Sequence, residues 1–316
     1  MPEPTQKQVD SDLANSMDLF QRADVGKVHA LDPLKPESIL LVLDGSQQDP
    51  AVISLGRQLR ENCGCRLAHL FIPPDGQTAV SADIEQQLKA AQSAAVVEGE
   101  VPEDEVASGR ILAAVETYGP SLLVAPCPFG RNFESVEGDS TGTVVDVLTS
   151  RSPVPFIAIR RPVSADDNPT QHLRLVFTGA NPAAETAARY ALGITKTGGL
   201  IDMLLLVEES FYDNFREALH AIDPEKNVGY EDLEHALART YGQLHASLQH
   251  STEQQGLQYE LLVRNEEDND PVTPGDPQTH PALIVLGLQR NDHDSQGEVH
   301  DYVRRSPHPV LVVPVK

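Results

Sequence analysis

Basic residues are scarce in this sequence. Its 316 residues include 47 Asp and Glu but only 24 Lys and Arg, which gives a formal net charge of −23. A surface with this charge repels polyanions, which argues against DNA, RNA or an acidic membrane surface as a direct partner. Tryptophan is absent and there are only 7 Tyr and 8 Phe, so we do not expect platforms on which nucleic acid bases stack.

Cysteines and long apolar runs are also scarce. Three cysteines, Cys63, Cys65 and Cys127, cannot form a disulfide framework, and no second ligand pair accompanies the first two to suggest a metal site. The best apolar run, 200–207, is far shorter than the ~20 residues of a membrane span. The first residues show no signal-peptide pattern. These features predict a cytoplasmic protein without a membrane partner or a metal.

The acidic surface is also poor in lysine, because most of the basic residues are arginines. Such a surface would suit a saline cytoplasm, where counterions screen the repulsion between carboxylates. An ordinary acidic protein explains the composition equally well.

Short apolar runs alternate with helical patterns from residue 37 onward. Strands are predicted at 38–43, 66–72, 96–101, 121–125 and 154–159, with helices at 49–62, 81–95, 103–118 and 141–150. Continuous apolar strands separated by helices indicate a parallel sheet that is buried on both faces. Residues 1–36 are polar, with one weak helical stretch at 11–22, and are predicted to be an extension rather than part of a core.

The same order of elements returns after a polar linker at 163–171. Strands are predicted at 173–178, 200–207, 257–263, 282–286 and 310–315, with helices at 182–197, 211–222 and 230–255. Four prolines between residues 265 and 281 indicate that the third helix is lost, and the carboxylates there indicate a solvated loop rather than a calcium site. The sequence thus predicts two α/β domains, 37–162 and 172–316, each with a five-stranded parallel sheet.

Two blocks of sequence repeat at nearly the same offset. Gly142 to Leu148 aligns with Gly297 to Val303, an offset of 155 (297 − 142), and Arg151 to Ile159 aligns with Arg305 to Val313, an offset of 154 (305 − 151). Agreement between adjacent blocks indicates a duplication, and two similar domains related by an approximate twofold axis. Asp146 and Asp301 occupy equivalent positions, which favours a structural role, such as bonding between the halves, over catalysis.

Ligands of an open parallel sheet bind beyond the carboxyl ends of its strands. The candidate binding residues follow three predicted strands: Asp44 and Gly45, then Ile72, then Gly130, Gly142 and Thr143. A glycine loop that leads into a helix can hold phosphate through backbone N–H groups, and a Thr hydroxyl adds a donor. Spacing alone favours the simpler interpretation that the two later glycines permit turns and that the threonine caps a helix.

The Leu-Val-Leu-Asp44-Gly-Ser opening, the glycine loop and the Ser-Pro-Val-Pro-Phe-Ile-Ala-Ile ending at 152–159 resemble those of the universal stress protein family. The resemblance covers about residues 37–162 and again 172–316. It implies a tandem protein of two Rossmann-like domains of the adenine nucleotide alpha hydrolase type that pair within one chain. It also implies ATP as a ligand, with Asp44 near the adenine and ribose and the glycines around the phosphates.

The nucleotide motif of this family, Gly-x-x-Gly followed after nine residues by Gly-Ser or Gly-Thr, is incomplete in the first half. Cys127 replaces the first glycine, and 11 residues rather than nine separate Gly130 from Gly142. Three carboxylates within that loop, Glu134, Glu137 and Asp139, would repel a triphosphate. We therefore expect at most weak ATP binding in this half.

The motif departs further in the second half. Thr178 stands at the position of Asp44, and Arg290 replaces the glycine three residues after Gly287. Glu298 follows Gly297, where a carboxylate at a helix N-terminus could supply the negative charge that phosphate would bring. This half is predicted to be a ligand-free partner of the first.

These patterns predict a cytoplasmic regulatory or ligand-sensing module of the stress response, with ATP as the one candidate cofactor. No His-Glu-x-x-His, Gly-x-Ser-x-Gly or Walker motif occurs, so no catalytic residue is assigned and any enzymatic activity is at most weak ATP hydrolysis. The alternative is a scaffold that binds no nucleotide and acts through protein partners or through self-association, for instance as a homodimer.

Overall fold

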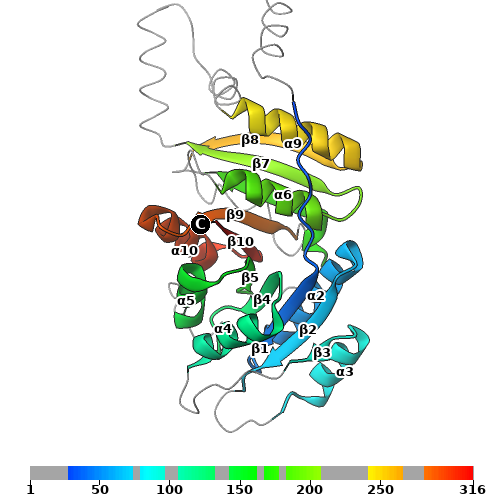
Figure 1. Cartoon of the computed structure of the whole chain (residues 1–316), viewed down its shortest axis with the longest axis vertical. Coiled ribbons are helices and arrows are strands. Elements are labelled where there is room, and N and C mark those ends of the chain that lie inside the picture. Colours follow the sequence, from blue (N-terminus) through cyan, green and yellow to red (C-terminus); the bar gives the residue numbers. More distant parts are fainter. Residues whose placement is uncertain are drawn as a thin grey trace, which may run out of the picture.

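The structure is a computed structural model of the whole chain (Figure 1). It describes residues 28–73, 79–96, 106–131, 142–161, 167–177, 183–207, 241–265 and 281–315. The predicted helices at 11–22 and 211–222, the start of the one at 230–255 and the acidic, proline-rich loop between 265 and 281 lie outside these residues.

Ten strands and seven helices alternate along the described residues. The first half contains β1 (Ser38–Leu43), α2 (Asp49–Cys63), β2 (Arg66–Phe71), α3 (Ala82–Ala90), β3 (Ala94–Ala95), α4 (Ala107–Tyr118), β4 (Leu122–Pro126), α5 (Thr143–Arg151) and β5 (Phe156–Ile159). The second half follows a 3-10 turn (Pro169–Gln171) and contains β6 (His172–Phe177), α6 (Ala184–Ile194), β7 (Leu200–Val207), α9 (Gly242–Gln255), β8 (Gln258–Asn265), β9 (Leu283–Gln289), α10 (His293–Arg305) and β10 (Val310–Val315).

All strands belong to one sheet, in the order β3-β2-β1-β4-β5-β10-β9-β6-β7-β8. Within each half the five strands are parallel and follow the same spatial order, which confirms the predicted fold class and the repeated order of strands. The expectation of two separate sheets is wrong, because β5 and β10 pair antiparallel and join the halves edge to edge (Figure 1).

Alternate residues of the buried strands enter two different cores. Ile39, Leu41 and Leu43 of β1 pack beneath α2 and α3, in a core that continues under α6 and α9 of the second half. Leu40 and Val42 point the other way, into a core covered by α4, α5 and α10. The continuous apolar runs seen in the sequence therefore correspond to strands that are buried on both faces.

The predicted helix at 81–95 ends earlier than expected. It stops at Ala90, after which Gln92 adopts a left-handed φ of 52° and the chain forms β3 beside β2. Alanine is common in this segment and favours helix, but pairing of Ala94 with Ala68 overrides that preference. Of the strand predicted at 96–101, only Val96 is described, and its N–H donates to the carbonyl of His69.

The N-terminal extension is less detached than predicted. Residues 28–36 run along α6 and α9 of the second half before they enter β1 (Figure 1). The Leu31 N–H donates to the Ser251 hydroxyl (2.7 Å), and the Leu34 N–H donates to the carbonyl of Arg189 (2.8 Å). Leu31 also packs against the core beneath these helices. This part of the extension therefore ties the beginning of the chain to its second half.

Candidate functional site

The carboxyl end of β1 carries a buried carboxylate that holds two loops together. Asp44 is only 1% exposed, and its Oδ1 accepts a hydrogen bond from the Ser46 N–H (2.9 Å). Its Oδ2 accepts from the Gly130 N–H (2.5 Å), in the loop that follows β4. The structure thus brings together the predicted site residues Asp44 and Gly130, although the carboxylate faces protein backbone.

A second buried carboxyl lies directly beside the first. Asp49, the first residue of α2, accepts from the N–H groups of Asp44 (3.1 Å) and Gly45 (2.9 Å). Burial, followed by the charge of Asp44, raises the pKa of Asp49 from 3.8 to about 7. This residue is not among the predicted site residues, because an aspartate before a proline at the start of a helix is an ordinary N-terminal signal.

The second glycine of the predicted loop begins a helix. Gly142 precedes the first residue of α5, has a φ of 80° and, as a glycine, has no side chain with which to cap the helix. A Cβ at this position would lie 3.4 Å from Cβ of Pro128, so α5 begins close to the loop that carries Gly130. Thr143 is exposed at the first helical position. Gly142 therefore lies next to the segment that carries Gly130. Residues 132–141, which include Glu134, Glu137 and Asp139, lie outside the described residues.

Ile72, the remaining predicted residue, lies at the same edge of the sheet, but its side chain points into the core. Its N–H donates to the carbonyl of Leu43 (2.9 Å), which places it at the carboxyl end of β2 beside β1. The side chain is 5% exposed and belongs to the core on the α4 side of the sheet. The Ile72 side chain therefore packs in the core next to the candidate site.

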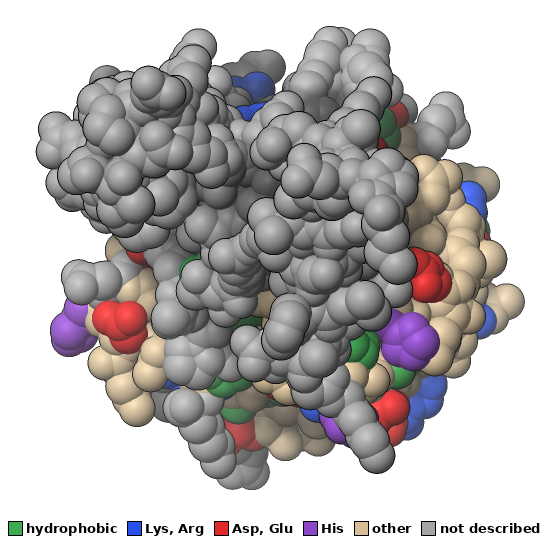
Figure 2. All heavy atoms as spheres, turned by 90° about the horizontal axis from the view of Figure 1, so that it is seen from above, with side chains coloured by type: hydrophobic (Ala, Val, Ile, Leu, Met, Phe, Trp, Pro, Cys, Tyr) green, Lys and Arg blue, Asp and Glu red, His purple; other side chains and the backbone are tan. Residues whose placement is uncertain are grey.

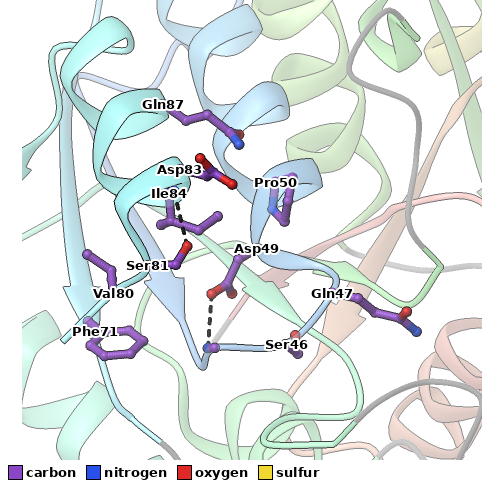
Figure 3. Close-up of a pocket in the computed structure, with 11 residues that line it drawn as sticks. Ser46, Gln47, Asp49, Pro50, Phe71, Val80, Ser81, Asp83, Ile84 and Gln87 are labelled. Atoms are coloured by element: carbon purple, nitrogen blue, oxygen red, sulfur yellow. Dashed lines mark hydrogen bonds between the residues drawn. The ribbon is translucent and has the colours of Figure 1, made fainter. Parts of the chain in front are cut away.

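A cavity of about 320 Å³ opens at the same edge, between the N-termini of α2 and α3 (Figure 3). It is lined by Gly45, Ser46, Gln47, Asp49, Pro50, Phe71, Val80, Ser81, Asp83, Ile84 and Gln87. Of the predicted site residues, it includes only Gly45. The apolar lining residues Phe71, Val80 and Ile84 pack against the core beneath α2 and α3. The cavity is therefore on the opposite side of β1 from Ile72 and α5.

The equivalent elements of the second half do not form a glycine loop before a helix. Gly287 lies within β9, where a Cβ would approach that of Ala183 to 2.8 Å, so close packing against the start of α6 requires this glycine. Gly297 and Glu298 lie in the second turn of α10, which begins at His293. The prediction that Glu298 stands at a helix N-terminus is therefore wrong. Thr178 lies outside the described residues.

Polar contacts cross from one half to the other beside the antiparallel strands. Asp146 of α5 lies 3.3 Å from Nδ1 of His300 on α10, and the guanidinium of Arg290 donates to the carbonyl of Ser152. Asp301, the repeat equivalent of Asp146, instead contacts Arg304 (2.6 Å) within α10. The predicted contact between halves is therefore present at the first of the two repeated aspartates.

The described residues offer little support for other kinds of site. The three cysteines form no disulfide, and burial raises the pKa of Cys63 and Cys127 to about 12, so these two thiols are poor nucleophiles at neutral pH. No group of three His, Cys, Asp or Glu residues within the described ranges could hold a metal ion. No helix among these residues is long and apolar enough to cross a membrane.

The described surface also shows few hydrophobic side chains. Val28 and Val106 are its exposed large hydrophobic residues. Seen from the end at which α9 and β8 lie, hydrophobic side chains reach the described surface only in small areas, while acidic, basic and histidine side chains occur around its rim (Figure 2).

The chain is similar to solved structures in its fold, but it has no match at the level of sequence. No protein-family model and no curated protein matches the chain. The structure of a universal stress protein from Archaeoglobus fulgidus is similar to this chain, with a TM-score of 0.53 and 14% sequence identity. The match covers 89% of this chain and 96% of that protein. A second match, to a protein of unknown function from Pseudomonas aeruginosa, covers 88% of this chain and 92% of that protein. Its TM-score is 0.54 and its sequence identity is 12%.

A further Pseudomonas aeruginosa protein, described provisionally as a universal stress protein, matches 88% of this chain over 93% of its own. Its TM-score is 0.52 at 13% identity. Because these matches span both halves of the sheet, the chain shares the whole tandem fold of these structures. At such low identity the likeness concerns the fold alone.

Proposed function

We propose that this chain is a tandem universal stress protein that serves in the cytoplasm as a ligand-sensing module of the stress response. Its one adenine-nucleotide site would lie in the first half. The observation that supports this proposal is the junction of Asp44 with Gly130, which brings the end of β1 against the glycine loop beside the first turn of α5. In the second half, α10 begins before Gly297, so the backbone N–H groups after that glycine lie inside the helix.

ATP would bind weakly at this site. The Gly130 N–H, a natural donor to phosphate, is already occupied by the Asp44 carboxylate, so a phosphate oxygen must displace a charge-assisted hydrogen bond. Loss of this bond, at about 1.5–3 kcal/mol, lowers affinity by about ten- to a hundredfold. The carboxylates of the loop, Glu134, Glu137 and Asp139, would add repulsion.

The same contact provides a route from ligand to protein surface. A ligand that takes the Gly130 N–H from Asp44 would change the position of the loop that leads into α5. Helix α5 in turn contacts α10 of the other half through Asp146 and His300. Ligand binding would therefore alter the junction between the halves, which is the kind of coupling a sensing module needs.

Calorimetry with ATP and Mg²⁺ tests this proposal. We expect one site per chain and loss of binding in Asp44→Asn, because the family resemblance places this carboxylate at the adenine and ribose. Binding should be unchanged in the control Glu298→Gln of the second half. Two equivalent sites, or full affinity in Asp44→Asn, would contradict the assignment. Far-UV circular dichroism of each variant shows whether a loss of binding reflects loss of fold.

The second candidate is a scaffold that binds no nucleotide. The occupied Gly130 N–H favours it, because the loop is already closed onto Asp44 without a ligand. Absence of calorimetric heat at millimolar ATP, with the fold intact, would establish this alternative. Such a scaffold would act through protein partners or through self-association.

A further inference from the structure

Among the residues that the structure describes, the two carboxyls at the end of β1 have no cationic partner. Asp44 and Asp49 are each 1% exposed, and both accept hydrogen bonds from backbone N–H groups. Their side chains also hydrogen-bond to each other. Neither forms an ion pair with a Lys, Arg or His among the residues that the structure describes. Buried carboxylates are normally paired with a cation, because desolvation of an isolated charge is costly.

The cavity beside Asp49 has the charge and the size to supply that cation. Its lining residues include Asp49, Asp83, Gln47 and Gln87, but no Lys, Arg or His. A volume of about 320 Å³ lies at the lower end of the range for small-molecule pockets. Figure 3 shows the two carboxylates on different helices around the same opening.

The helix termini at the cavity do not favour an anion. The N-termini of α2 and α3 both face it and carry partial positive charge. Each is already matched by its own acidic residue in the first turn, Asp49 in α2 and Asp83 in α3. Asp83 contributes one negative charge and Asp49 contributes a second as it ionises around pH 7, so above that pH the two carboxylates exceed the two half charges of the helix ends and the cavity attracts cations.

The rest of the lining favours an organic cation over a metal ion. Phe71, Val80, Ile84 and Pro50 form apolar walls, which a hydrated metal ion would not use. The face of an aromatic ring such as that of Phe71 attracts ammonium groups. The cavity also lacks the third His, Cys, Asp or Glu that a metal cluster would need within the described residues.

We propose that the cavity between α2 and α3 binds a small organic ammonium ion, whose charge is balanced by Asp49 and Asp83. This cavity adjoins the proposed nucleotide site, because Gly45 lines it and Asp44 lies beside Asp49, but the glycine loop and α5 lie on the other side of β1. Binding of ATP and binding of the cation are measured in separate titrations, so the failure of one proposal is distinguishable from the failure of the other.

Binding of the cation would be linked to release of a proton. Asp49 is faced by Asp44 from the end of β1 and by Asp83 from α3, and its pKa is raised to about 7. A cation in the cavity favours the charged form of Asp49 and so lowers that pKa. Affinity should therefore rise with pH, by about tenfold between pH 5.5 and pH 8, while the ligand itself stays protonated.

The test uses 1,4-diaminobutane as the probe and 1,4-butanediol as a neutral compound of the same shape. Calorimetry at constant ionic strength, set with KCl, should show saturable binding of the diamine to the full chain and none of the diol. Equal binding of both compounds, or an equal heat when KCl is injected in place of the diamine at the same concentration of charge, would overturn the proposal.

Variants place the binding in the cavity. Asp83 is exposed, so Asp83→Asn should leave the fold intact and weaken diamine binding by up to about fivefold. Asp49→Asn should weaken it by about ten- to a hundredfold and remove most of the pH dependence. Glu116→Gln removes an exposed carboxylate from α4 and should change nothing. If Asp83→Asn and Glu116→Gln behave alike, the diamine binds to the general negative surface and the proposal is wrong.

Discussion

Ile157 of β5 lies directly opposite Leu311 of β10, at the centre of the antiparallel ladder that joins the halves. The two numbers differ by 154 (311 − 157), which is the offset of the repeated block that contains them. Each residue is thus the repeat equivalent of the other. The approximate twofold axis of the duplication passes between them, and both side chains are fully buried in the core that spans the two halves.

Truncation of these two residues should show coupling between the halves. We expect Ile157→Ala and Leu311→Ala each to lower the free energy of unfolding by about 2–5 kcal/mol. Because the side chains are neighbours, the double variant should depart from additivity by about 0.5 kcal/mol or more. Urea titrations of the parent, the two single variants and the double variant measure this departure from additivity.

Ile111 provides the control for that cycle. It is also fully buried, but it lies in α4 on the other face of the sheet. Combined with Leu311→Ala, Ile111→Ala should be additive within about 0.5 kcal/mol. Strict additivity for the pair Ile157 and Leu311 as well would show that the junction does not couple the halves.

The repeat in the sequence was sufficient to predict the two equivalent halves, but not the way in which they meet. Apolar runs such as 38–43 and 200–207 are strands with the predicted bounds, because a strand buried on both faces leaves a continuous signal. Whether β5 pairs with β10 depends on contacts between edges, and an apolar run such as 310–315 fits an edge strand and a central strand equally well.

Contact between the extension and α6 gives a second prediction. A Cβ at Gly193 would lie 2.0 Å from the carbonyl oxygen of Leu34, which is backbone and cannot easily move. Gly193→Ala should therefore lower the free energy of unfolding by about 1–3 kcal/mol or release the extension. Thermal unfolding detects the first outcome, and faster limited proteolysis near residues 28–36 detects the second.

Gly297 is the matched control, since it also lies within a helix but has no atom within 4 Å of the position of a Cβ. Gly297→Ala should be neutral or should stabilise the chain by up to about 1 kcal/mol, because alanine favours helix. Similar effects at both glycines would show that the contact between α6 and the extension contributes nothing.

The candidate site was only partly predictable. The sequence located Asp44, Gly130 and Gly142 beyond the ends of their strands, because runs of apolar residues end at recognisable positions. It could not show that the carboxylate of Asp44 accepts from the Gly130 N–H, since that contact joins residues 86 positions apart. The cavity was missed for the same reason, because its lining comes from three separate segments whose side chains meet only in the fold.

A buried ionic cluster in the second half occupies positions that are apolar in the first. Leu40 pairs with Ala68 in the first half, and the third residues of the corresponding strands, Arg174 and Asp202, pair in the second. Asp202 accepts from Arg174 (2.9 Å) and from His172 (2.7 Å). Burial alone would raise the pKa of Asp202, but these two partners hold it below its usual value.

Replacement of one member of this cluster should cost more than replacement of two. Asp202→Ala leaves the Arg174 charge buried without its partner and should lower the free energy of unfolding by about 3–5 kcal/mol. The double variant Arg174→Leu with Asp202→Ala recreates the apolar pair of the first half and should recover much of that loss. Denaturant titrations at pH 7 measure the free energy of unfolding of the single and of the double variant. A double variant less stable than Asp202→Ala would show that the cluster is needed for more than its own charge balance.

The pH dependence of stability should report on Asp49. In the unfolded chain its carboxyl has the ordinary pKa of 3.8, whereas in the folded chain burial and Asp44 raise the pKa to about 7. Between these values the folded state binds more protons than the unfolded state, so the contribution of Asp49 to stability is fully present below about pH 4 and is lost as pH rises through 7. The expected loss is about 2–4 kcal/mol.

Asp49→Asn removes this titration. The variant should differ little from the parent in stability at pH 5, because the protonated carboxyl of the parent and the amide of the variant are both neutral. At pH 8 the variant should gain relative to the parent, because the parent then carries an extra buried charge. Urea titrations at both pH values measure the change, with Glu116→Gln as the exposed control. A difference that stays constant from pH 5 to pH 8 would mean that the two backbone N–H groups balance the charge of Asp49, and that no cation is needed beside it.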